Sequence, residues 1–526
     1  MKHFYRSCFM FTKILLLISL LLTGCAFLNS PGSIDAPALS STADTILPIT
    51  LKGYLIGSPP PGLPDVEEEL NKKLSKDINA ILDINYINWS DLQSKYPLVL
   101  ASDDDIDWIF TAGWCFYPIM AAKGAFMEIT DDMLRERMPL HYTALTHTTA
   151  MDDVRINGDL FMIPTSTPDR KVNVVLYRED LRKKYNVPEF KSFSEIEPYL
   201  EVVKMNEKAM IPINMDYTYD VSRPFETLCS DRGDYFISFT IASQVNSGIV
   251  FNFEDPEGRL YTVLDEPYYS MGKEAAYITK QWYDKGYINS NVFSNDIRSK
   301  ELFTQGKSAV AFGNSIDIQS CILNAEEKGW EIGIIPVVSS KSGHAPNDSS
   351  QVSGIGIPTR SKNASLVMMA FDRIMEDEAY DTLAYFGIEG KNYVVEDGKV
   401  ALPDGITTIE NSYPPDASGF WFTNKDILMP LKMENAHYLE LKKKIKRGML
   451  VNSVYGGFIP VSDNIKTELT NLNKVMLQYF NPIAFGKVKD VEAAFAELNK
   501  QMKIAGIDKV MEQMRSQTES YLKQRK

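Results

Sequence analysis

Residues 71–114 read "NKKLSKDINAILDINYINWSDLQSKYPLVLASDDDIDWIFTAGW". Apolar side chains alternate with polar ones at Leu82, Ile84 and Tyr86, which is the period of a half-buried strand. A helical stretch follows, and "IDWIFTAG" supplies a second strand at residues 106–113. Two strands joined by a helix at this spacing indicate a crossover connection, so this stretch predicts a mostly parallel sheet and an α/β fold.

The same alternation of strands and helices extends upstream. "ITLKGYLIG" at residues 49–57 has strand chemistry and ends at the proline-rich break "SPPPGLP". Asp65 and Glu68 then form a capping-box pattern that predicts the start of a helix. The apolar residues of that helix fall on one face, and they are Val66, Leu70, Leu74 and Ile78.

The pattern changes at residues 158–185, where the chain is extended and contains Pro164 and Pro168. We interpret this stretch as a crossing into a second lobe. A Gly- and Ser-rich stretch at residues 339–358 predicts a second crossing, near Ser350–Ile357. From about residue 430 the chain becomes helix-rich.

The N-terminus carries a short apolar run from Ile14 to Leu22. A membrane-spanning helix needs about 20 apolar residues, so this run is too short to span. It follows the basic residues Lys2, Arg6 and Lys13 and ends in Leu-Thr-Gly-Cys, which resembles the bacterial lipobox. We therefore expect a lipoprotein signal peptide that is cut before Cys25, with a lipid such as palmitate on Cys25 and a membrane anchor rather than a span.

These observations divide the chain into five parts. The expected parts are a signal peptide at 1–24, a tether at 25–45, a first lobe at 46–165 to which about 352–390 return, a second lobe at 166–351, and a helix-rich C-terminal region at 391–526 that packs on the lobes.

Composition excludes several classes of partner. The net charge is −14, and removal of residues 1–24 takes three positive charges with it and leaves −17. An acidic chain lacks the basic footprint of a nucleic-acid-binding protein and does not adhere broadly to anionic lipid. The mature chain keeps only Cys115, Cys229 and Cys321 besides Cys25, which is no disulfide scaffold. Stability must therefore come from a hydrophobic core.

Catalytic and metal-binding motifs are absent from the sequence. Gly306-Lys307-Ser308 is no P-loop, because the first P-loop glycine is replaced by Glu301. Gly313-Asn314-Ser315 is no nucleophile elbow, because the closing glycine is replaced by Asp317. The five histidines are scattered, and the acidic run 103–105 is interpreted as a solvated turn rather than a calcium site. We expect no enzyme, no cofactor and no metal.

Several segments together resemble one protein family. Residues 71–114 resemble the first lobe of bacterial extracellular solute-binding proteins of the sugar-type family 1, the receptors of ABC importers. The later segments "FTQGKSAVAFGNS", "WEIGIIPV" and "SGIGIPTRSKNASLVMMAFDRIM" resemble that family's core segments in the expected order. "FGIEGKNYVVEDG" and the tail at residues 497–522 are similar to a subgroup with an extended C-terminal region, often of lipoproteins.

The resemblance implies a periplasmic-binding-protein-like fold of two α/β lobes that close on a solute, without catalysis or cofactor. It implies a monomeric receptor on the extracytoplasmic face of a bacterial membrane, with the subunits of an ABC permease as partners. A saccharide or oligosaccharide is the expected solute, favoured by the family and by the 11% aromatic content. Two alternatives stay open, a cell-surface glycan-active enzyme and a sensor or interaction lipoprotein on the same fold.

Ligands of open α/β sheets lie outside the carboxyl ends of the strands, and this rule selects the first two candidate site residues. The others are selected as hydrogen-bonding and aromatic side chains near strand ends or, for Trp421, on a Gly-flanked loop. Trp114 and Tyr117 directly follow the strand at residues 106–113. The remaining candidates for ligand contact are Asp216, Tyr217 and Tyr219 in "NMDYTYD", Asn314 at a strand end, and Trp421 in "SGFWFTN". Trp89 and Trp108 are interpreted as core or lobe surface, and Trp330 as core.

Overall fold

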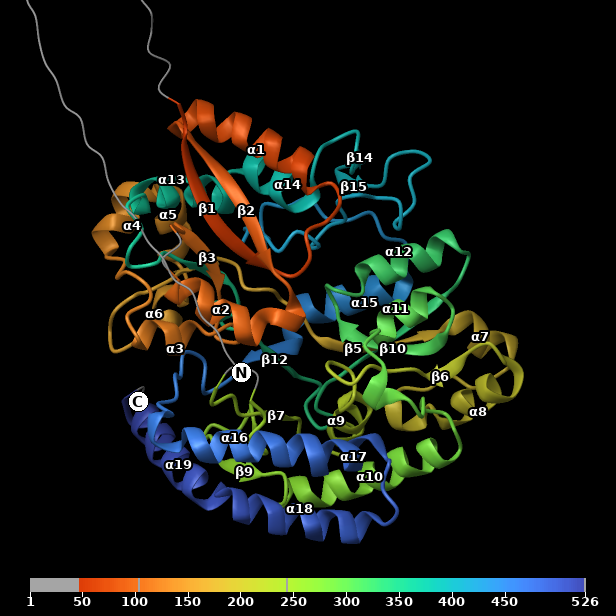
Figure 1. Ribbon diagram of the computed structural model, residues 1–526. Coiled ribbons are helices and arrows are strands. Elements are labelled where there is room, and N and C mark those ends of the chain that lie inside the picture. Colours follow the sequence, from red (N-terminus) through yellow and green to blue (C-terminus); the bar gives the residue numbers. More distant parts are fainter. Residues whose placement is uncertain (1–46, 103–104, 243–244, 525–526) are drawn as a thin grey trace, which may run out of the picture. The chain divides into compact units, whose positions relative to one another are not determined.

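The computed structural model describes residues 47–102, 105–242 and 245–524 (Figure 1). All described residues belong to one compact unit, which begins at Leu47. The predicted signal peptide, Cys25 and the tether lie outside the described residues. Every helix in the described part of the chain is too short or too polar to cross a membrane.

The segment at residues 71–114 supplies the edge strand β2 and the central strand β3 of a five-stranded sheet with the order β2-β1-β3-β13-β4. β1 is parallel to β2 and β3, and β13 is antiparallel to β3 and β4. The predicted parallel arrangement is confirmed for the three strands that the sequence identified. The strands of this first sheet are β1 (Ile49–Ile56), β2 (Ala80–Ile87), β3 (Trp108–Thr111), β4 (Ile163–Pro164) and β13 (Gly354–Gly356).

Helices cover the first sheet, and α1 carries the apolar face that the sequence predicted. The predicted capping box is wrong, because the helix starts at Leu63 with Pro64 in its first turn and without a side-chain cap. The helices of this first lobe are α1 (Leu63–Ile78), α2 (Leu92–Ala101), α3 (Tyr117–Ala122), α4 (Asp131–Arg137), α5 (Pro139–Leu145), α6 (Ala150–Val154), α13 (Ala364–Glu376) and α14 (Glu378–Phe386).

A second lobe is built on a four-stranded sheet with the order β11-β5-β10-β6 and a three-stranded sheet with the order β7-β8-β9. Its strands are β5 (Asn173–Arg178), β6 (Ile211–Ile213), β7 (Phe236–Ser238), β8 (Ile249–Asn252), β9 (Leu260–Thr262), β10 (Ser308–Asn314) and β11 (Ile332–Pro336). Its helices are α7 (Glu179–Lys184), α8 (Glu197–Asn206), α9 (Arg223–Ser230), α10 (Tyr268–Asp284), α11 (Ser299–Thr304) and α12 (Gln319–Glu327).

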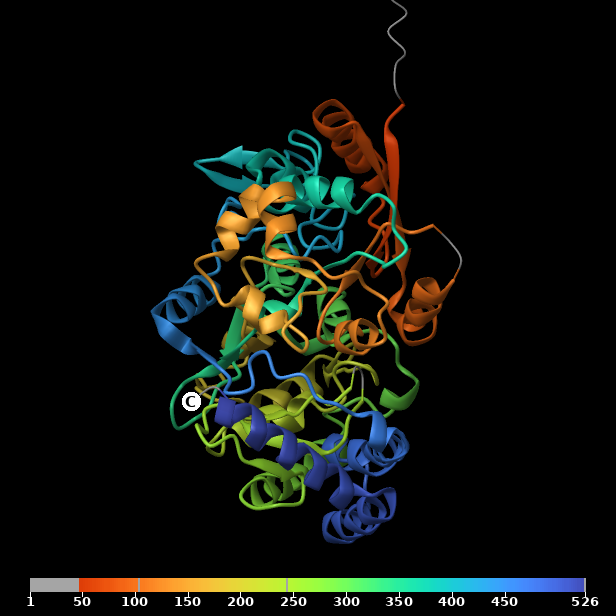
Figure 2. The ribbon, with the colours of Figure 1, turned by 90° about the vertical axis from the view of Figure 1, so that its left-hand side faces the viewer.

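The C-terminal region contributes apolar side chains to the cores of both lobes. Tyr413, Phe420 and Phe422 belong to the core of the first lobe, whereas apolar residues between Ile465 and Met514 belong to the core of the second. Figures 1 and 2 show the blue helices of this region beside the second lobe, where α17 and α18 contact α10. The helices are α15 (Ala436–Lys444), α16 (Lys466–Val475), α17 (Asn481–Phe485), α18 (Val491–Ala505) and α19 (Ile507–Gln524). Two short pairs complete the fold, β12 (Ala345–Asn347) with β16 (Leu450–Asn452) and β14 (Val394–Glu396) with β15 (Lys399–Ala401).

The chain passes from the first sheet to the second between β4 and β5, at residues 165–172, next to the predicted Pro164–Pro168. The predicted return near Ser350–Ile357 is wrong. The backbone N–H of Gly113 donates to the carbonyl of Gln351, and β13 already belongs to the first sheet. The return therefore precedes Ser350, earlier in the Gly- and Ser-rich stretch at residues 339–358, and the other predicted domain limits stay predictions.

In each lobe a glycine on one strand makes room for a large aromatic side chain of the neighbouring strand. Gly53 lies opposite Trp108, and a Cβ at residue 53 would lie 2.1 Å from the Trp108 ring. Gly333 lies opposite Tyr177, and a Cβ there would lie 2.0 Å from the Tyr177 ring. Trp108 is fully buried and donates its indole N–H to the carbonyl of Leu51 at 3.1 Å. These aromatic side chains therefore lie across the adjacent strand and cannot move aside.

We expect Gly53→Ala and Gly333→Ala each to lower the free energy of unfolding by about 1–3 kcal/mol, the cost of overpacking a core. Chemical denaturation of the purified protein measures this. Gly456→Ala is the control, because its nearest neighbour is the Ser453 carbonyl oxygen at 3.4 Å. If the unfolding curves of both Gly53→Ala and Gly333→Ala match the curve of the parent, the packing described here is contradicted.

Candidate functional site

Three tryptophans meet beyond the carboxyl ends of the parallel strands. Trp89 comes two residues after β2, Trp114 comes three residues after β3, and Trp421 arrives from the C-terminal region. The Trp89 ring lies 5.7 Å from both the Trp114 and the Trp421 ring, measured between centroids and nearly parallel to each. The Trp114 and Trp421 rings lie 6.3 Å apart. We call Trp89, Trp114 and Trp421 the aromatic platform.

The buried parts of the platform are fixed by hydrogen bonds and packing. Trp114 donates its indole N–H to the carbonyl of Val352 at 2.8 Å, and Trp421 donates to the carbonyl of Asp416 at 3.0 Å. The Phe110 ring meets Trp421 edge-on at 5.4 Å. Trp89 is 42% exposed. Because two of the indole N–H groups are already used, the platform offers a ligand mainly apolar ring surface.

Two predicted site residues lie in the core instead. Tyr117 is fully buried and donates its hydroxyl hydrogen to the carbonyl of Val154. Asp216 is fully buried, and its carboxylate accepts backbone N–H groups of residues 218, 219 and 220 at 2.8–3.2 Å. Both side chains complete local structure, Tyr117 by anchoring α3 and Asp216 by closing a turn. We therefore remove both from the candidate site.

The other predicted residues of the second lobe are more open. Tyr219 is 41% exposed, and the Arg298 guanidinium lies 5.1 Å from its ring centroid. Tyr217 is half-buried against Phe293. Asn314 is half-buried, and its side-chain oxygen accepts the backbone N–H groups of Ile316 and Asp317 at 3.0 Å. Tyr219 stays a candidate for ligand contact, and Asn314 shapes the turn that presents Asp317.

Arg298 is a candidate that the sequence did not indicate. Its ion pairs with Asp317 and Asp220 are long, at 3.7 and 3.9 Å, and its buried Nε atom has no acceptor within the described ranges. A buried donor without a partner is costly. An incoming hydroxyl or carboxylate oxygen would remove that cost, so Arg298 is suited to hold a polar ligand.

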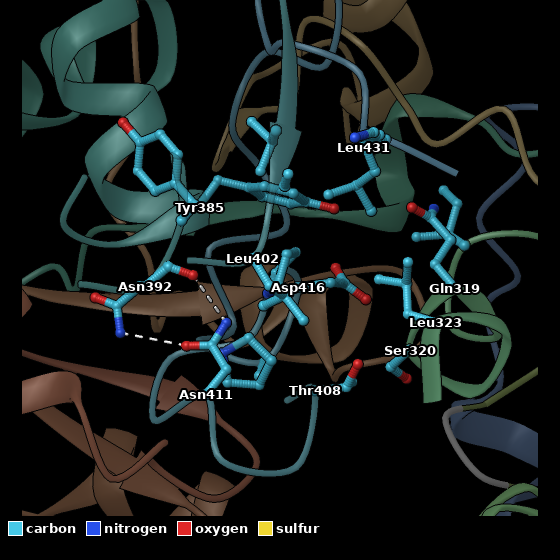
Figure 3. A pocket seen from close by; sticks show the side chains of 18 of the residues that line it. Gln319, Ser320, Leu323, Tyr385, Asn392, Leu402, Thr408, Asn411, Asp416 and Leu431 are labelled. Carbon is cyan, nitrogen blue, oxygen red and sulfur yellow. Dashed lines mark hydrogen bonds between the residues drawn. The ribbon is translucent and has the colours of Figure 1, made fainter. Parts of the chain in front are cut away.

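A pocket of about 350 Å³ lies between α12 and the segment that includes β14 and β15, and we call it the side pocket (Figure 3). α12 supplies Gln319, Ser320 and Leu323 to one wall. The opposite wall contains both polar and apolar side chains. Those labelled in Figure 3 are Tyr385, Asn392, Leu402, Thr408, Asn411, Asp416 and Leu431. Asn392 and Asn411 are hydrogen-bonded to each other at 3.3 Å and fix that wall.

Asp416 connects the side pocket with the aromatic platform. Its carboxyl group lines the pocket, while its carbonyl holds the Trp421 indole. Burial raises the pKa of the Asp416 carboxyl to about 7, the nearby Asp169 and Asp317 add to the rise, and Lys425 opposes it. Asp416 therefore carries a proton in part of the molecules at neutral pH and can donate a hydrogen bond as well as accept one.

A buried polar cluster fastens the Trp421 segment to the first crossing. The Glu376 carboxylate accepts hydrogen bonds from Ser166 Oγ at 2.7 Å and from Asn424 Nδ2 at 2.6 Å, and it lies 2.8 Å from His141 Nδ1. The backbone N–H of Asn424 donates to Asp381 at 2.9 Å. The next backbone N–H, of residue 425, donates to the Thr167 hydroxyl at 2.8 Å.

The carboxyl-end rule that selected Trp114 would also have selected Trp89, because both follow parallel strands of the same sheet. The sequence interpretation of Trp89 and Trp108 as core or lobe surface is confirmed for Trp108, which is fully buried, whereas for Trp89 it missed the position beside Trp114 and Trp421. Nothing in the local sequence marks Arg298 or Asp416. Both depend on contacts between segments far apart in the chain. Within the described ranges, no three His, Cys, Asp or Glu side chains are placed to hold a metal ion.

Two family models match the chain. One, described as bacterial extracellular solute-binding protein, matches residues 72–375, and one described as a domain of unknown function, DUF3502, matches residues 454–523. A carbohydrate ABC transporter substrate-binding protein of Streptococcus pneumoniae serotype 4 is 24% identical over 486 residues, which cover 90% of this chain and 91% of that protein. A polygalacturonan/rhamnogalacturonan-binding protein of Bacillus subtilis is 27% identical over 128 residues, 23% of this chain and 26% of that protein.

Solved structures show the same fold. The crystal structure of the N-glycan transport solute-binding protein of Streptococcus pneumoniae gives a TM-score of 0.74 at 23% identity, covering 91% of this chain and 100% of that one. The same protein in complex with Man5GlcNAc gives 0.69 at 22% identity, covering 91% and 99%. A crystal structure of an alginate-binding protein gives 0.63 at 16% identity, covering 90% and 98%.

We expect the free energy of unfolding to depend on pH, because the buried polar cluster contains Asp381. Asp381 is fully buried, and burial raises its pKa from 3.8 to about 8, with Lys425 opposing the rise. Between about pH 4 and pH 8 the folded chain therefore keeps the Asp381 proton, whereas the unfolded chain has already released it. The free energy of unfolding therefore falls as pH rises through this interval. Asp381→Asn keeps an acceptor for the Asn424 N–H and cannot ionise. We expect the melting temperature of Asp381→Asn to rise relative to that of the parent as pH goes from 4 to 9.

The exposed substitution Asp404→Asn is the control for this pH series. Melting curves of Asp381→Asn that run parallel to those of the parent at every pH would show that Asp381 is ionised in the folded protein.

Proposed function

Since the chain belongs to the bacterial extracellular solute-binding proteins, we propose that it is the receptor of an ABC importer and binds a saccharide between its two lobes. The observation that carries this proposal is the aromatic platform at the carboxyl edge of the first sheet. The flat apolar face of a pyranose ring fits an exposed indole face, and burial of that surface supplies the driving force.

Polar groups around the platform support a ligand rich in hydroxyl groups. The Asp416 carbonyl accepts the Trp421 indole N–H, and Arg298 and Asp317 lie on the second lobe. Specific ligand sites combine apolar walls with a few directed polar groups, and this set provides both. The similar carbohydrate ABC transporter protein and the glycan-bound structure support the same class of ligand.

The family also indicates where the protein acts and with which partners. The protein works outside the cytoplasm, where we propose that a lipid on Cys25 holds it at the membrane and that the permease of an importer receives its solute. We propose that it acts as a monomer and without a cofactor, and that it does not turn its ligand over. A sensor lipoprotein would share the binding site but have no permease, and the presence of permease genes beside this one separates the two cases.

One observation favours a second candidate function. Asp317 and Asp416 line the same pocket, and the pKa of Asp416 is raised to about 7. Two carboxyl groups of this kind, one of them protonated, are also what a glycoside hydrolase uses. Incubation of the protein with Man5GlcNAc, followed by mass spectrometry, separates the functions. A binding protein leaves the glycan intact, and release of free sugar would establish the hydrolase.

The proposed function is tested first by a thermal-shift screen of the purified protein. The panel contains Man1GlcNAc, Man5GlcNAc, alginate and fructan oligosaccharides, and short peptides as a comparison. A saccharide at 100 times its dissociation constant should stabilise the folded protein by about 2.7 kcal/mol. Stabilisation by peptides and by no saccharide would overturn the proposal.

Trp89→Ala should weaken saccharide binding by about 1–3 kcal/mol, roughly 5- to 150-fold in the dissociation constant. The stability without ligand should change little, because the Trp89 side chain is 42% exposed. Calorimetric titration with a saccharide from the screen measures the affinity. Trp330→Ala is the matched control, since Trp330 lies beneath the Arg178 guanidinium and outside the platform. Equal affinities for the parent and Trp89→Ala would contradict the role of the platform.

Cys25→Ala should release the protein from the membrane fraction of the cells that make it, because the lipid would have no attachment site. Membrane fractionation and metabolic labelling with a palmitate analogue measure this. Retention of both the label and the membrane association in the variant would contradict the lipid anchor on Cys25.

A further inference from the structure

The side pocket and the aromatic platform share one residue. Asp416 lines the pocket with its side chain and holds the Trp421 indole N–H with its carbonyl at 3.0 Å. A ligand whose first ring lies on the platform therefore has the side pocket beside it. We propose that this pocket takes a second, uncharged sugar unit of the same ligand, so that the receptor selects a neutral oligosaccharide over a monosaccharide or an oligouronate. The inference rests on the proposed function.

The lining of the pocket suits a sugar ring. Its apolar part includes Leu323, Val400, Leu402, Pro414, Pro415 and Leu431, which can cover the C–H faces of a pyranose. Its polar part includes Gln319, Ser320 and Asn411, which can donate to or accept from ring hydroxyls. A volume of about 350 Å³ lies at the lower end of the range for small-molecule pockets, about 300–1,000 Å³. The pocket is therefore large enough for one sugar unit of a longer ligand.

The charges of the pocket select against acidic sugars. Four carboxyl side chains line it, and they are Asp317, Glu326, Glu327 and Asp416. Its two ammonium groups already have partners, since Lys300 lies 3.5 Å from Asp317 and Lys432 lies 2.6 Å from Glu396. Among the residues that line the pocket, a uronate carboxylate would meet like charges without an unpaired cation, since Arg298 is not part of the lining. A neutral sugar would meet acceptors for its hydroxyl groups instead.

The pocket is bounded by both lobes, so its occupant contacts both. α12 belongs to the second lobe, while the opposite wall is joined to the first lobe through the Tyr413 hydroxyl, which donates to the carbonyl of Ala384 at 2.8 Å. The two walls are linked where the N–H and the hydroxyl of Thr408 both donate to the Glu327 carboxylate at 2.6 Å. A sugar unit in the pocket therefore favours the arrangement in which α12 and Thr408 are in contact.

Ser320→Trp tests the inference by filling the pocket from α12, where Ser320 is exposed. Leu402→Trp fills it independently from the opposite wall. Ser516→Trp, an exposed serine of α19, is the matched control. The probes are mannose, which has a single ring, and Man5GlcNAc, both titrated by calorimetry, and melting curves without ligand establish that each variant is folded. We expect both filled variants to bind Man5GlcNAc at least about tenfold more weakly and to bind mannose within about twofold of the parent.

The outcomes separate this inference from the proposed function. Equal loss of affinity for mannose and for Man5GlcNAc, or no loss for either, overturns the subsite while leaving the saccharide receptor in place. A parent that binds neither these glycans nor any other saccharide of the screen overturns both. Trigalacturonate is the charged probe, and we expect the parent to bind it at least about tenfold more weakly than Man5GlcNAc. Equal binding of trigalacturonate overturns the selection for neutral sugars.

Discussion

The Glu376 carboxylate at the end of α13 is the point on which the candidate site depends. It accepts hydrogen bonds from Ser166 of the first crossing and from Asn424, and it lies beside His141 of α5. These groups are 210, 48 and 235 residues away in the sequence. A nearly buried carboxylate with several charge-assisted contacts fixes geometry more strongly than neutral hydrogen bonds do. The position of Trp421, three residues before Asn424, follows from this attachment.

The C-terminal region therefore contributes to the candidate site as well as covering the lobes. The segment between Asn411 and Asn424 supplies one ring of the platform and one wall of the side pocket, and the same segment is fastened to the crossing at Ser166 and Thr167. If the crossing at Ser166 and Thr167 moves, Trp421 should move with it, because hydrogen bonds join the two segments. A receptor that closes on its ligand needs such a connection, because only groups whose contacts differ between the open and the closed state can shift the balance between them.

The sequence predicted the fold because periodicity and order along the chain determine it. The alternation at Leu82, Ile84 and Tyr86 and the apolar face of α1 placed the parallel strands, and the family followed from the order of the segments. Trp114 and Trp421 were placed in one site by the carboxyl-end rule and by a Gly-flanked loop, and they lie 6.3 Å apart. Tyr117 and Asp216 were misjudged because a residue at a strand end can equally turn inward to complete a turn or a core. The raised pKa of Asp416 and the Arg298 Nε donor without an acceptor depend on contacts between segments far apart in the chain, which no local pattern contains.

The platform formed by Trp89, Trp114 and Trp421 should carry one sugar ring of the ligand, and a crystal structure of the protein with a bound oligosaccharide from the screen tests this. We expect one pyranose ring within van der Waals contact of the Trp89 or Trp421 indole, about 4 Å between ring atoms, beside the Asp416 carboxyl group. A glycan bound between the lobes with all its rings away from the three indoles would contradict it.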